Sequence, residues 1–160
     1  MALLVAREAC RLWHGSSVET ARRRILASEV SHFGVDEAAT ILGLSGDAAV
    51  SVPCDNRLRM DPKALSRAIA ECHSEGLIPI TVVGTAGTTD FGSIDPLASL
   101  GAICRNQGIS FHVDAALGRG LFASPRSRHC LRGIEYADAV TANYHKAFSQ
   151  PVSCGAFLVR

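Results

Sequence analysis

Thr141-Ala142-Asn143-Tyr144-His145-Lys146 places a histidine and a lysine at the exit of an apolar run. A second apolar run upstream ends in His112-Val113-Asp114-Ala115-Ala116. One segment offers an amine and the other a carboxylate, and each lies where a strand should give way to a loop. The pattern predicts a fold that brings Lys146 and Asp114 together.

Strand-like and helix-like patterns alternate outward from these two segments. Short apolar or β-branched runs predict strands, and spacing with a period near 3.6 predicts helices. The alternation predicts an α/β fold with a mostly parallel sheet flanked by helices. Strands are expected at residues 25–28, 48–52, 78–83, 109–113, 137–142 and 153–159, and helices at 1–13, 34–42, 62–75 and 96–107, with a break at 15–17.

Two of the predicted helices begin with the same dipeptide. Asp61-Pro62 and Asp95-Pro96 each offer an aspartate as N-cap and a proline at the first helical position. The sequence therefore predicts that both Asp61 and Asp95 cap helices.

Length and composition describe one modest domain. The chain has 160 residues, of which 48% are hydrophobic, enough to bury a core. Its 16 Lys and Arg residues against 15 Asp and Glu leave a net charge of +1, which gives no reason to propose a nucleic-acid or membrane partner. The short cluster at residues 22–24, three arginines, is expected to be a solvated segment before a strand. No apolar run approaches the roughly 20 residues that span a bilayer.

The six cysteines form no CxxC pair, so the sequence predicts neither a metal site nor a thioredoxin-like motif. Scattered through apolar segments, they are expected to act as small hydrophobic side chains. No secretory signal precedes them, which favours a reducing, cytoplasmic location. They are Cys10, Cys54, Cys72, Cys104, Cys130 and Cys154.

In parallel sheets, ligands bind at the carboxyl ends of the strands. A lone lysine there is usually a surface residue, a lone aspartate often a cap, and a lone histidine often a core residue. A carboxylate that closes an apolar strand, however, loses solvation unless a positive group meets it. A strand-end lysine together with a strand-end aspartate fits pyridoxal phosphate, whose aldehyde binds a lysine and whose ring nitrogen binds an acidic residue. The predicted strand-end residues are His32, Thr88, Thr89, Asp114, His145 and Lys146.

Residues 112–116, 137–146 and 151–155 together resemble the group II pyridoxal-phosphate-dependent amino-acid decarboxylases. This family includes the aromatic L-amino-acid, glutamate and diaminobutyrate decarboxylases. The resemblance covers essentially the whole chain, with several motifs in the family's order. It implies the large domain of the aspartate-aminotransferase type (fold type I) and homodimers with sites at the subunit interface. It also implies conversion of an L-amino acid to an amine and carbon dioxide, with residues 144–153 most similar to diaminobutyrate decarboxylases.

The resemblance also implies roles around the cofactor ring. Lys146 resembles the Schiff-base lysine, and Asp114 resembles the partner of the ring nitrogen. Ala116 resembles the small residue against one face of the ring, and His32 the histidine stacked on the other. Thr89 resembles the residue beside the phenolic oxygen.

Two further roles follow from the same resemblance. Asn143 and the backbone of His145 resemble phosphate contacts, and the His145 side chain resembles a group that positions the substrate carboxylate. One departure is Gly34, where many relatives have serine, which is expected to loosen the site locally.

The ends of the chain suggest a partial domain. Residues 1–13 read as a helix already under way, and the chain stops on a predicted strand. Residues 1–160 are therefore expected to form part of the large domain, without the N-terminal segment that carries the phosphate-binding loop and without the small C-terminal domain. Two alternatives remain open: another fold type I reaction such as transamination or desulfuration, or an inactive fragment that acts at most as an interaction module.

Overall fold

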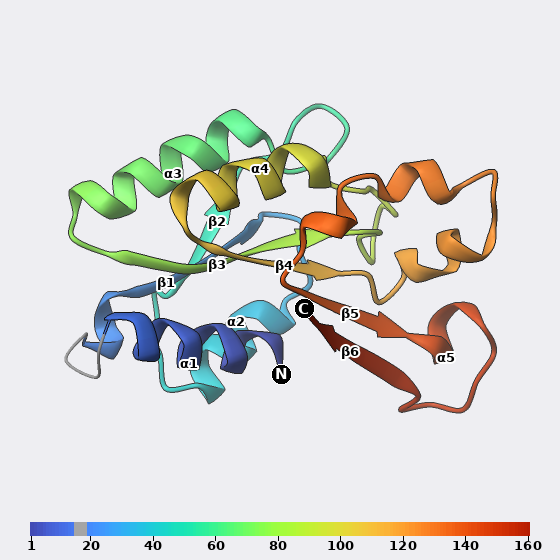
Figure 1. The fold of residues 1–160 in the computed structure, drawn as a ribbon, viewed down its shortest axis with the longest axis horizontal. Helices are drawn as coiled ribbons and strands as arrows, with labels where there is room; N and C mark the ends of the chain where they lie inside the picture. Colours follow the sequence, from blue (N-terminus) through green and yellow to red (C-terminus); the bar gives the residue numbers. More distant parts are fainter. Residues whose placement is uncertain (15–18) are drawn as a thin grey trace.

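One six-stranded sheet runs through the molecule (Figure 1). The computed structural model describes residues 1–14 and 19–160, without the side chains of residues 13, 14, 119 and 147, so the predicted break at 15–17 lies outside the described residues. The strand order is β2-β1-β3-β4-β5-β6, with only β6 antiparallel to its neighbour. The strands are β1 (Arg23–Ser28), β2 (Ala49–Val52), β3 (Ile78–Thr85), β4 (Ser110–Asp114), β5 (Ala139–Asn143) and β6 (Gly155–Val159). The predicted mostly parallel α/β sheet is confirmed.

Helices cover both faces of this sheet. Helices α1 (Ala2–His14) and α2 (Gly34–Ile41) lie on one face, and α3 (Pro62–Ser74) and α4 (Leu97–Gln107) lie on the other (Figure 1). The shorter helical segments are η1 (Thr20–Arg22), η2 (Gly118–Ala123), η3 (Arg128–Leu131), η4 (Ile134–Tyr136) and α5 (Tyr144–Ala147). Among the described residues, none of the helices is both long and apolar enough to span a membrane.

Alternation along the strands divides the core into two clusters. Leu26, Val82 and Phe111 point toward α3 and α4, where they meet side chains such as Leu65 and Leu100. The neighbouring positions Ile25, Ala27 and Val83 point the other way, into a second cluster with Leu3 and Ala39 of α1 and α2. Because successive strand residues face opposite sides, the central strands β1 and β3 contribute to both clusters.

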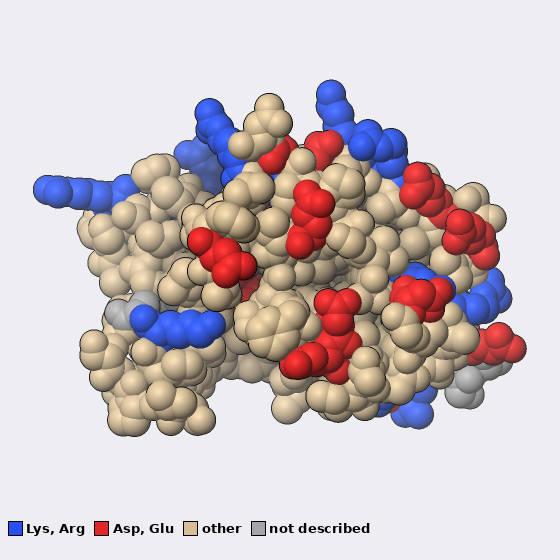
Figure 2. Space-filling model, turned by 180° about the vertical axis from the view of Figure 1, so that it is seen from behind, with Lys and Arg blue, Asp and Glu red and all other residues tan. Residues whose placement is uncertain are grey.

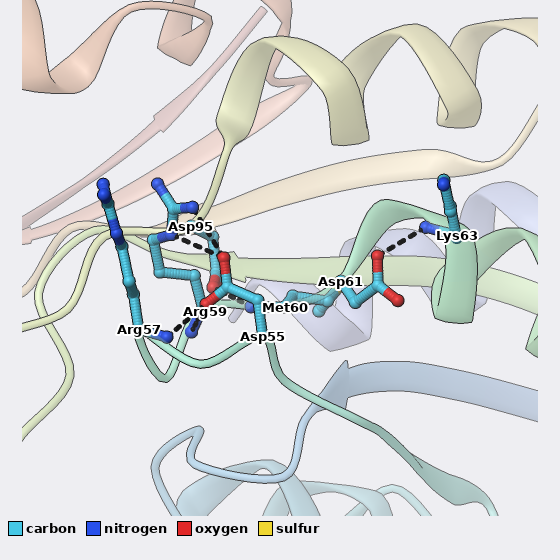
Figure 3. A network of polar contacts seen from close by, with 7 residues as sticks. All are labelled: Asp55, Arg57, Arg59, Met60, Asp61, Lys63 and Asp95. Atoms are coloured by element: carbon cyan, nitrogen blue, oxygen red, sulfur yellow. Dashed lines mark hydrogen bonds and ion pairs between the residues drawn. The ribbon is translucent and has the colours of Figure 1, made fainter.

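The two predicted aspartate caps behave differently. The Asp61 side chain accepts a hydrogen bond from the Lys63 amide at 3.0 Å, so this cap is confirmed. Asp95 is buried and makes no cap, so that prediction was wrong. Its Oδ1 atom accepts a hydrogen bond from the Met60 amide at 2.7 Å (Figure 3). Its Oδ2 atom accepts one from the Thr85 amide, also at 2.7 Å. Asp95 therefore ties the turn before α3 to the end of β3.

The expectation of a solvated arginine cluster is correct for Arg22, which is exposed and precedes β1, but wrong for the other two arginines. Arg23 and Arg24 are the first residues of β1 and are only 4% and 6% exposed. The Arg24 guanidinium pairs with Asp47 at 2.8 Å and donates to the Ala21 carbonyl at 2.7 Å. A partner carboxylate close by allows a charge to enter the fold, a condition that the local sequence does not reveal.

The surface carries charges of both signs. On the face seen in Figure 2, acidic side chains are scattered over the centre and Lys and Arg side chains lie mostly toward the outline. All six cysteines are free. Cys10, Cys72 and Cys104 are buried as expected for small hydrophobic side chains, but Cys130 and Cys154 are exposed, which corrects that prediction for these two.

Candidate active site

A small cavity of about 150 Å³ opens beside the carboxyl ends of β3 and β4. It brings together five of the seven predicted site residues, from segments far apart in the chain. These are His32, Thr89, Asp114, Ala116 and Lys146. Its remaining lining residues are Thr85, Gly87, Thr88 and Leu117.

Asp114 ends β4 and is half-buried at the edge of the cavity. Its Oδ1 atom accepts a hydrogen bond from the Ala116 amide at 3.0 Å. No described protein group donates to its Oδ2 atom. This carboxylate therefore retains one oxygen for a positively charged or N–H group that enters the cavity.

Lys146 lines the same cavity from the single turn α5 that follows β5. Its side chain is exposed, and it is the only lysine or arginine among the described residues that line the cavity. An amine and a carboxylate thus line one cavity. This is the arrangement that residues 112–116 and 141–146 predicted.

The third group is His32, in the turn between β1 and α2. The Gly34 amide donates to its Nδ1 atom at 2.9 Å, so Nδ1 carries the lone pair and the neutral ring carries its proton on Nε2. The ring also stacks on Phe33, with centroids 4.2 Å apart. A Cβ atom at residue 34 would lie 2.9 Å from Nδ1, so glycine lets the backbone approach the ring closely, and the expected local loosening stays a prediction.

Two loops in close contact form the base of the cavity. The Ala86 amide donates to the Asp114 carbonyl at 2.8 Å. A Cβ atom at Gly118 would overlap the Ala86 carbonyl oxygen, so only glycine permits this approach. Thr88 is buried and its hydroxyl bonds to that of Ser93 at 2.9 Å, whereas Thr89 is exposed.

Asn143 and His145 are not among the residues that line this cavity. Asn143 ends β5 with its side chain beside Gly155. The His145 Nδ1 atom lies 2.9 Å from the Cys154 carbonyl oxygen and can donate to it. Both residues therefore lie just before Lys146 in the chain and outside the cavity.

A second cavity of about 490 Å³ adjoins the first, since His32 and Asp114 line both. Helices α1 and α2 form much of its wall, and His112 and Thr141 contribute polar groups. Burial lowers the pKa of His112, so this ring is neutral near pH 7. Sequence reasoning did not assign a role to either residue, although His112 is two positions before Asp114 and must share its face of the strand.

The donor set fits pyridoxal phosphate. A lysine amine, a carboxylate with a free oxygen, an aromatic ring and a small side chain converge on one cavity. The described residues contain no group of three or more His, Cys, Asp or Glu side chains placed to hold a metal ion.

The sequence profile described as the pyridoxal-dependent decarboxylase conserved domain matches residues 8–160. The chain belongs to this family. The resemblance seen in the sequence motifs is thereby confirmed, and pyridoxal phosphate is the cofactor of the family to which the chain belongs.

Individual relatives agree with this family. L-2,4-diaminobutyrate decarboxylase of Rhizobium meliloti (strain 1021) is 43% identical over 136 residues, which cover 85% of this chain and 27% of the relative. Cysteine sulfinic acid decarboxylase of Mus musculus is 39% identical over 136 residues, 85% of this chain and 28% of the relative. A crystal structure of Oryza sativa TDC with PLP superposes with a TM-score of 0.93 at 26% identity and covers 99% of this chain and 34% of that one. The chain thus spans between a quarter and about a third of the length of these relatives.

Proposed function

We propose that residues 1–160 are part of the cofactor-binding large domain of an enzyme that removes the α-carboxylate of an L-amino acid as carbon dioxide. The observation that carries this proposal is the shared cavity of Lys146 and Asp114, closed by His32 and Ala116. The share of each relative that the chain covers supports its assignment as part of a larger domain.

When bound, pyridoxal phosphate supplies an aldehyde that binds amines and a ring that withdraws electrons from the substrate α-carbon. Lys146 would hold the cofactor through its amine. The free Oδ2 atom of Asp114 would accept the ring N–H, and charge attraction would keep that proton on the ring. His32 and Ala116 would orient the ring. The protein would thus contribute positioning through these two residues and a fixed charge through Asp114.

The His32 tautomer suggests a further contribution to substrate binding. Because Nδ1 accepts the Gly34 amide, the free N–H of this ring is on Nε2. A donor at the cavity wall suits a substrate carboxylate. We assign Thr89 to the phenolic oxygen, Asn143 and the His145 backbone to the phosphate, and the His145 side chain to the substrate carboxylate, in line with the family resemblance.

The substrate that the comparisons favour is a diaminobutyrate-like amino acid, since 43% identity links the chain to a diaminobutyrate decarboxylase. The alternative is the acidic substrate named for the mouse relative. The six free cysteines support a cytoplasmic location, and the family resemblance supports a homodimer. Light scattering of the purified protein measures that oligomeric state.

A covalent trapping experiment tests cofactor binding. The protein is incubated with pyridoxal phosphate and reduced with borohydride, and its peptides are then mapped by mass spectrometry. The chain contains two lysines, Lys63 and Lys146, so the assignment is unambiguous. The adduct is expected on Lys146 and lost in Lys146→Ala, while Lys63→Ala, a change at an exposed position of α3, keeps it.

A second measurement tests the reaction. Carbon dioxide release is followed over a panel of amino acids that includes diaminobutyrate, glutamate, cysteine sulfinate and an aromatic amino acid. Release from one of them supports decarboxylation. Amino-group transfer without carbon dioxide release would instead favour the transaminase alternative, and a folded protein that acquires no adduct would favour an inactive interaction module.

A further inference from the structure

The second cavity contains a pair of polar residues directly behind Asp114. His112 is 7% exposed and lies two residues before Asp114 on the same face of β4. Thr141 of β5 is the register partner of Asp114, so their side chains are neighbours on that face. All three line the same cavity, and none of the chemistry proposed above uses His112 or Thr141.

Hydrogen bonding fixes the proton positions of this pair. The His112 Nδ1 atom lies 3.0 Å from the Ala139 carbonyl oxygen, which can only accept, so Nδ1 carries the proton. The neutral ring therefore has its lone pair on Nε2. Thr141 Oγ1 lies 3.4 Å from Nε2 and must be the donor in this contact. The hydroxyl proton of Thr141 is thus directed at His112.

The direction of that hydroxyl matters because of its neighbour. Without an acceptor at residue 112, the Thr141 hydroxyl could rotate toward the Asp114 carboxylate, which is charged and has a free oxygen. A hydroxyl bonded there would compete with any N–H group that enters from the first cavity. His112 removes that competitor without touching the first cavity, whose lining residues do not include it.

We propose that His112 and Thr141 are positioning residues: His112 draws the Thr141 hydroxyl away from Asp114 and keeps a carboxylate oxygen available for the cofactor's ring nitrogen. The proposal rests on the proposed function, since it assigns Asp114 to that nitrogen. The proposal adds two residues of the second cavity, His112 and Thr141, to the groups that support the site.

Relative affinity for two ligands isolates this effect. Dissociation constants are measured for pyridoxal phosphate and for its analogue in which a C–H group replaces the ring nitrogen. Their ratio reports the contact between Asp114 and the ring nitrogen, because general damage to the cavity weakens both ligands alike. In His112→Phe the preference for pyridoxal phosphate is expected to fall roughly tenfold, the effect of about one competing hydrogen bond.

A double variant provides the decisive comparison. In His112→Phe/Thr141→Val the competing hydroxyl is gone, so the preference is expected to return to the wild-type ratio although two side chains have changed. His112→Gln keeps an acceptor near the position of Nε2 and should also retain the wild-type ratio. A purely structural role predicts instead that the double variant is no better than His112→Phe.

Each outcome has a clear meaning. An unchanged ratio in His112→Phe, or a double variant that does not recover, overturns the proposal while leaving the proposed function intact. If the wild-type protein binds pyridoxal phosphate no better than the analogue, Asp114 does not bind the ring nitrogen. In that case both the role proposed for Asp114 and the positioning role of His112 and Thr141 fail. The borohydride adduct on Lys146 distinguishes the two cases, because it requires only the aldehyde.

Discussion

The two walls of the candidate site are built in opposite ways. One wall is the β3–α4 loop, residues 86–96, which carries Thr88 and Thr89. The other is the β5–β6 segment, residues 144–154, which carries Lys146. Both follow strands of the same sheet, and both border the same cavity. The two walls differ in how many of their polar groups form hydrogen bonds with the protein.

Hydrogen bonds of the buried Asp95 and of the loop's own backbone hold the β3–α4 loop in place. The Asp95 amide donates to the Thr85 carbonyl at 2.9 Å, and its carboxylate binds the Thr85 and Met60 amides. Inside the loop, the Gly87 and Thr88 amides both donate to the Ser93 carbonyl at 3.0 Å. Buried hydrogen bonds of this kind hold the backbone in one conformation.

The β5–β6 segment has much less support. Its described residues are exposed or half-buried, and Ser149 and Ser153 adopt positive φ values of 51° and 74°. Its ends are joined by hydrogen bonds from the Tyr144 amide and the His145 ring to the Cys154 carbonyl, each 2.9 Å long. The sheet and the β3–α4 loop therefore fix the carboxylate side of the site, whereas the lysine side depends on a weakly anchored segment.

The largest expected effect comes from removing the internal anchor. Asp95→Ala leaves the Met60 and Thr85 amides buried without an acceptor. The free energy of unfolding should fall by about 3 kcal/mol, measured by urea denaturation. Asp95→Asn keeps one acceptor and should lose less. An Ala variant as stable as the wild type would show that the β3–α4 loop does not depend on this carboxylate.

The same carboxylate predicts a pH dependence. Burial raises the pKa of Asp95, while its hydrogen bonds with the Thr85 and Met60 amides oppose the rise. The folded state therefore binds this proton more tightly than the unfolded chain. The resulting stabilisation is present below the ordinary carboxyl pKa and is lost as the pH rises through the raised value. Relative to Asp95→Asn, the wild type should thus lose stability as the pH rises from about 4.

The contact between the two loops at the base of the cavity is the next target. In Gly118→Ala the added methyl group would overlap the Ala86 carbonyl oxygen and force the loops apart. The free energy of unfolding should fall by about 2 kcal/mol, and affinity for pyridoxal phosphate should fall with it. Gly46→Ala is the matched control, because a Cβ atom there has nothing within 4 Å. Equal stability of the two variants would contradict this close packing.

A smaller effect is expected in the other wall. Ser153→Gly removes the steric cost of a positive φ, although glycine also increases the entropy of the unfolded chain. The net gain should be about 0.5 kcal/mol in thermal or urea unfolding. A loss of stability would mean that the serine side chain contributes more than its backbone conformation costs.

The smallest effect concerns the half-buried ion pair of Asp55 and Arg59, beside the Asp95 anchor. Hydrogen bonding to Arg59 lowers the pKa of Asp55 to about 2 (Figure 3). This pair contributes stability above the ordinary carboxyl pKa, and the contribution is lost as the pH falls toward 2. Arg59→Ala should raise the Asp55 pKa toward its ordinary value in an NMR titration, with little change in stability at neutral pH. Arg57 binds Asp55 only through its backbone amide, so Arg57→Ala should leave the Asp55 pKa nearly unchanged.

The two strand exits were readable from the sequence because their signals are local. An apolar run followed by Asp114, and another followed by Lys146, predicted both the sheet and the convergence of these side chains. Asp61 was equally readable, since an N-cap binds an amide only two residues away.

The sequence predictions were wrong for residues whose burial or hydrogen bonding depends on a partner far away in the chain. Asp95 has the same local context as Asp61, but Met60 offers it an amide from 35 residues away. Arg24 is buried because Asp47 lies beside it in the fold. His112 and Thr141 come from different strands, and only the register of β4 with β5 places them behind Asp114.

By itself, the sequence determined the fold class, the family and the two groups at the strand ends, because periodicity and motif order are properties of short stretches of chain. Only the tertiary structure decided which side chains share a cavity, which charges are buried and which of the two walls is anchored. The physical reason is that burial and hydrogen bonding depend on neighbours that are distant along the chain, and these neighbours are defined only once the sheet has assembled.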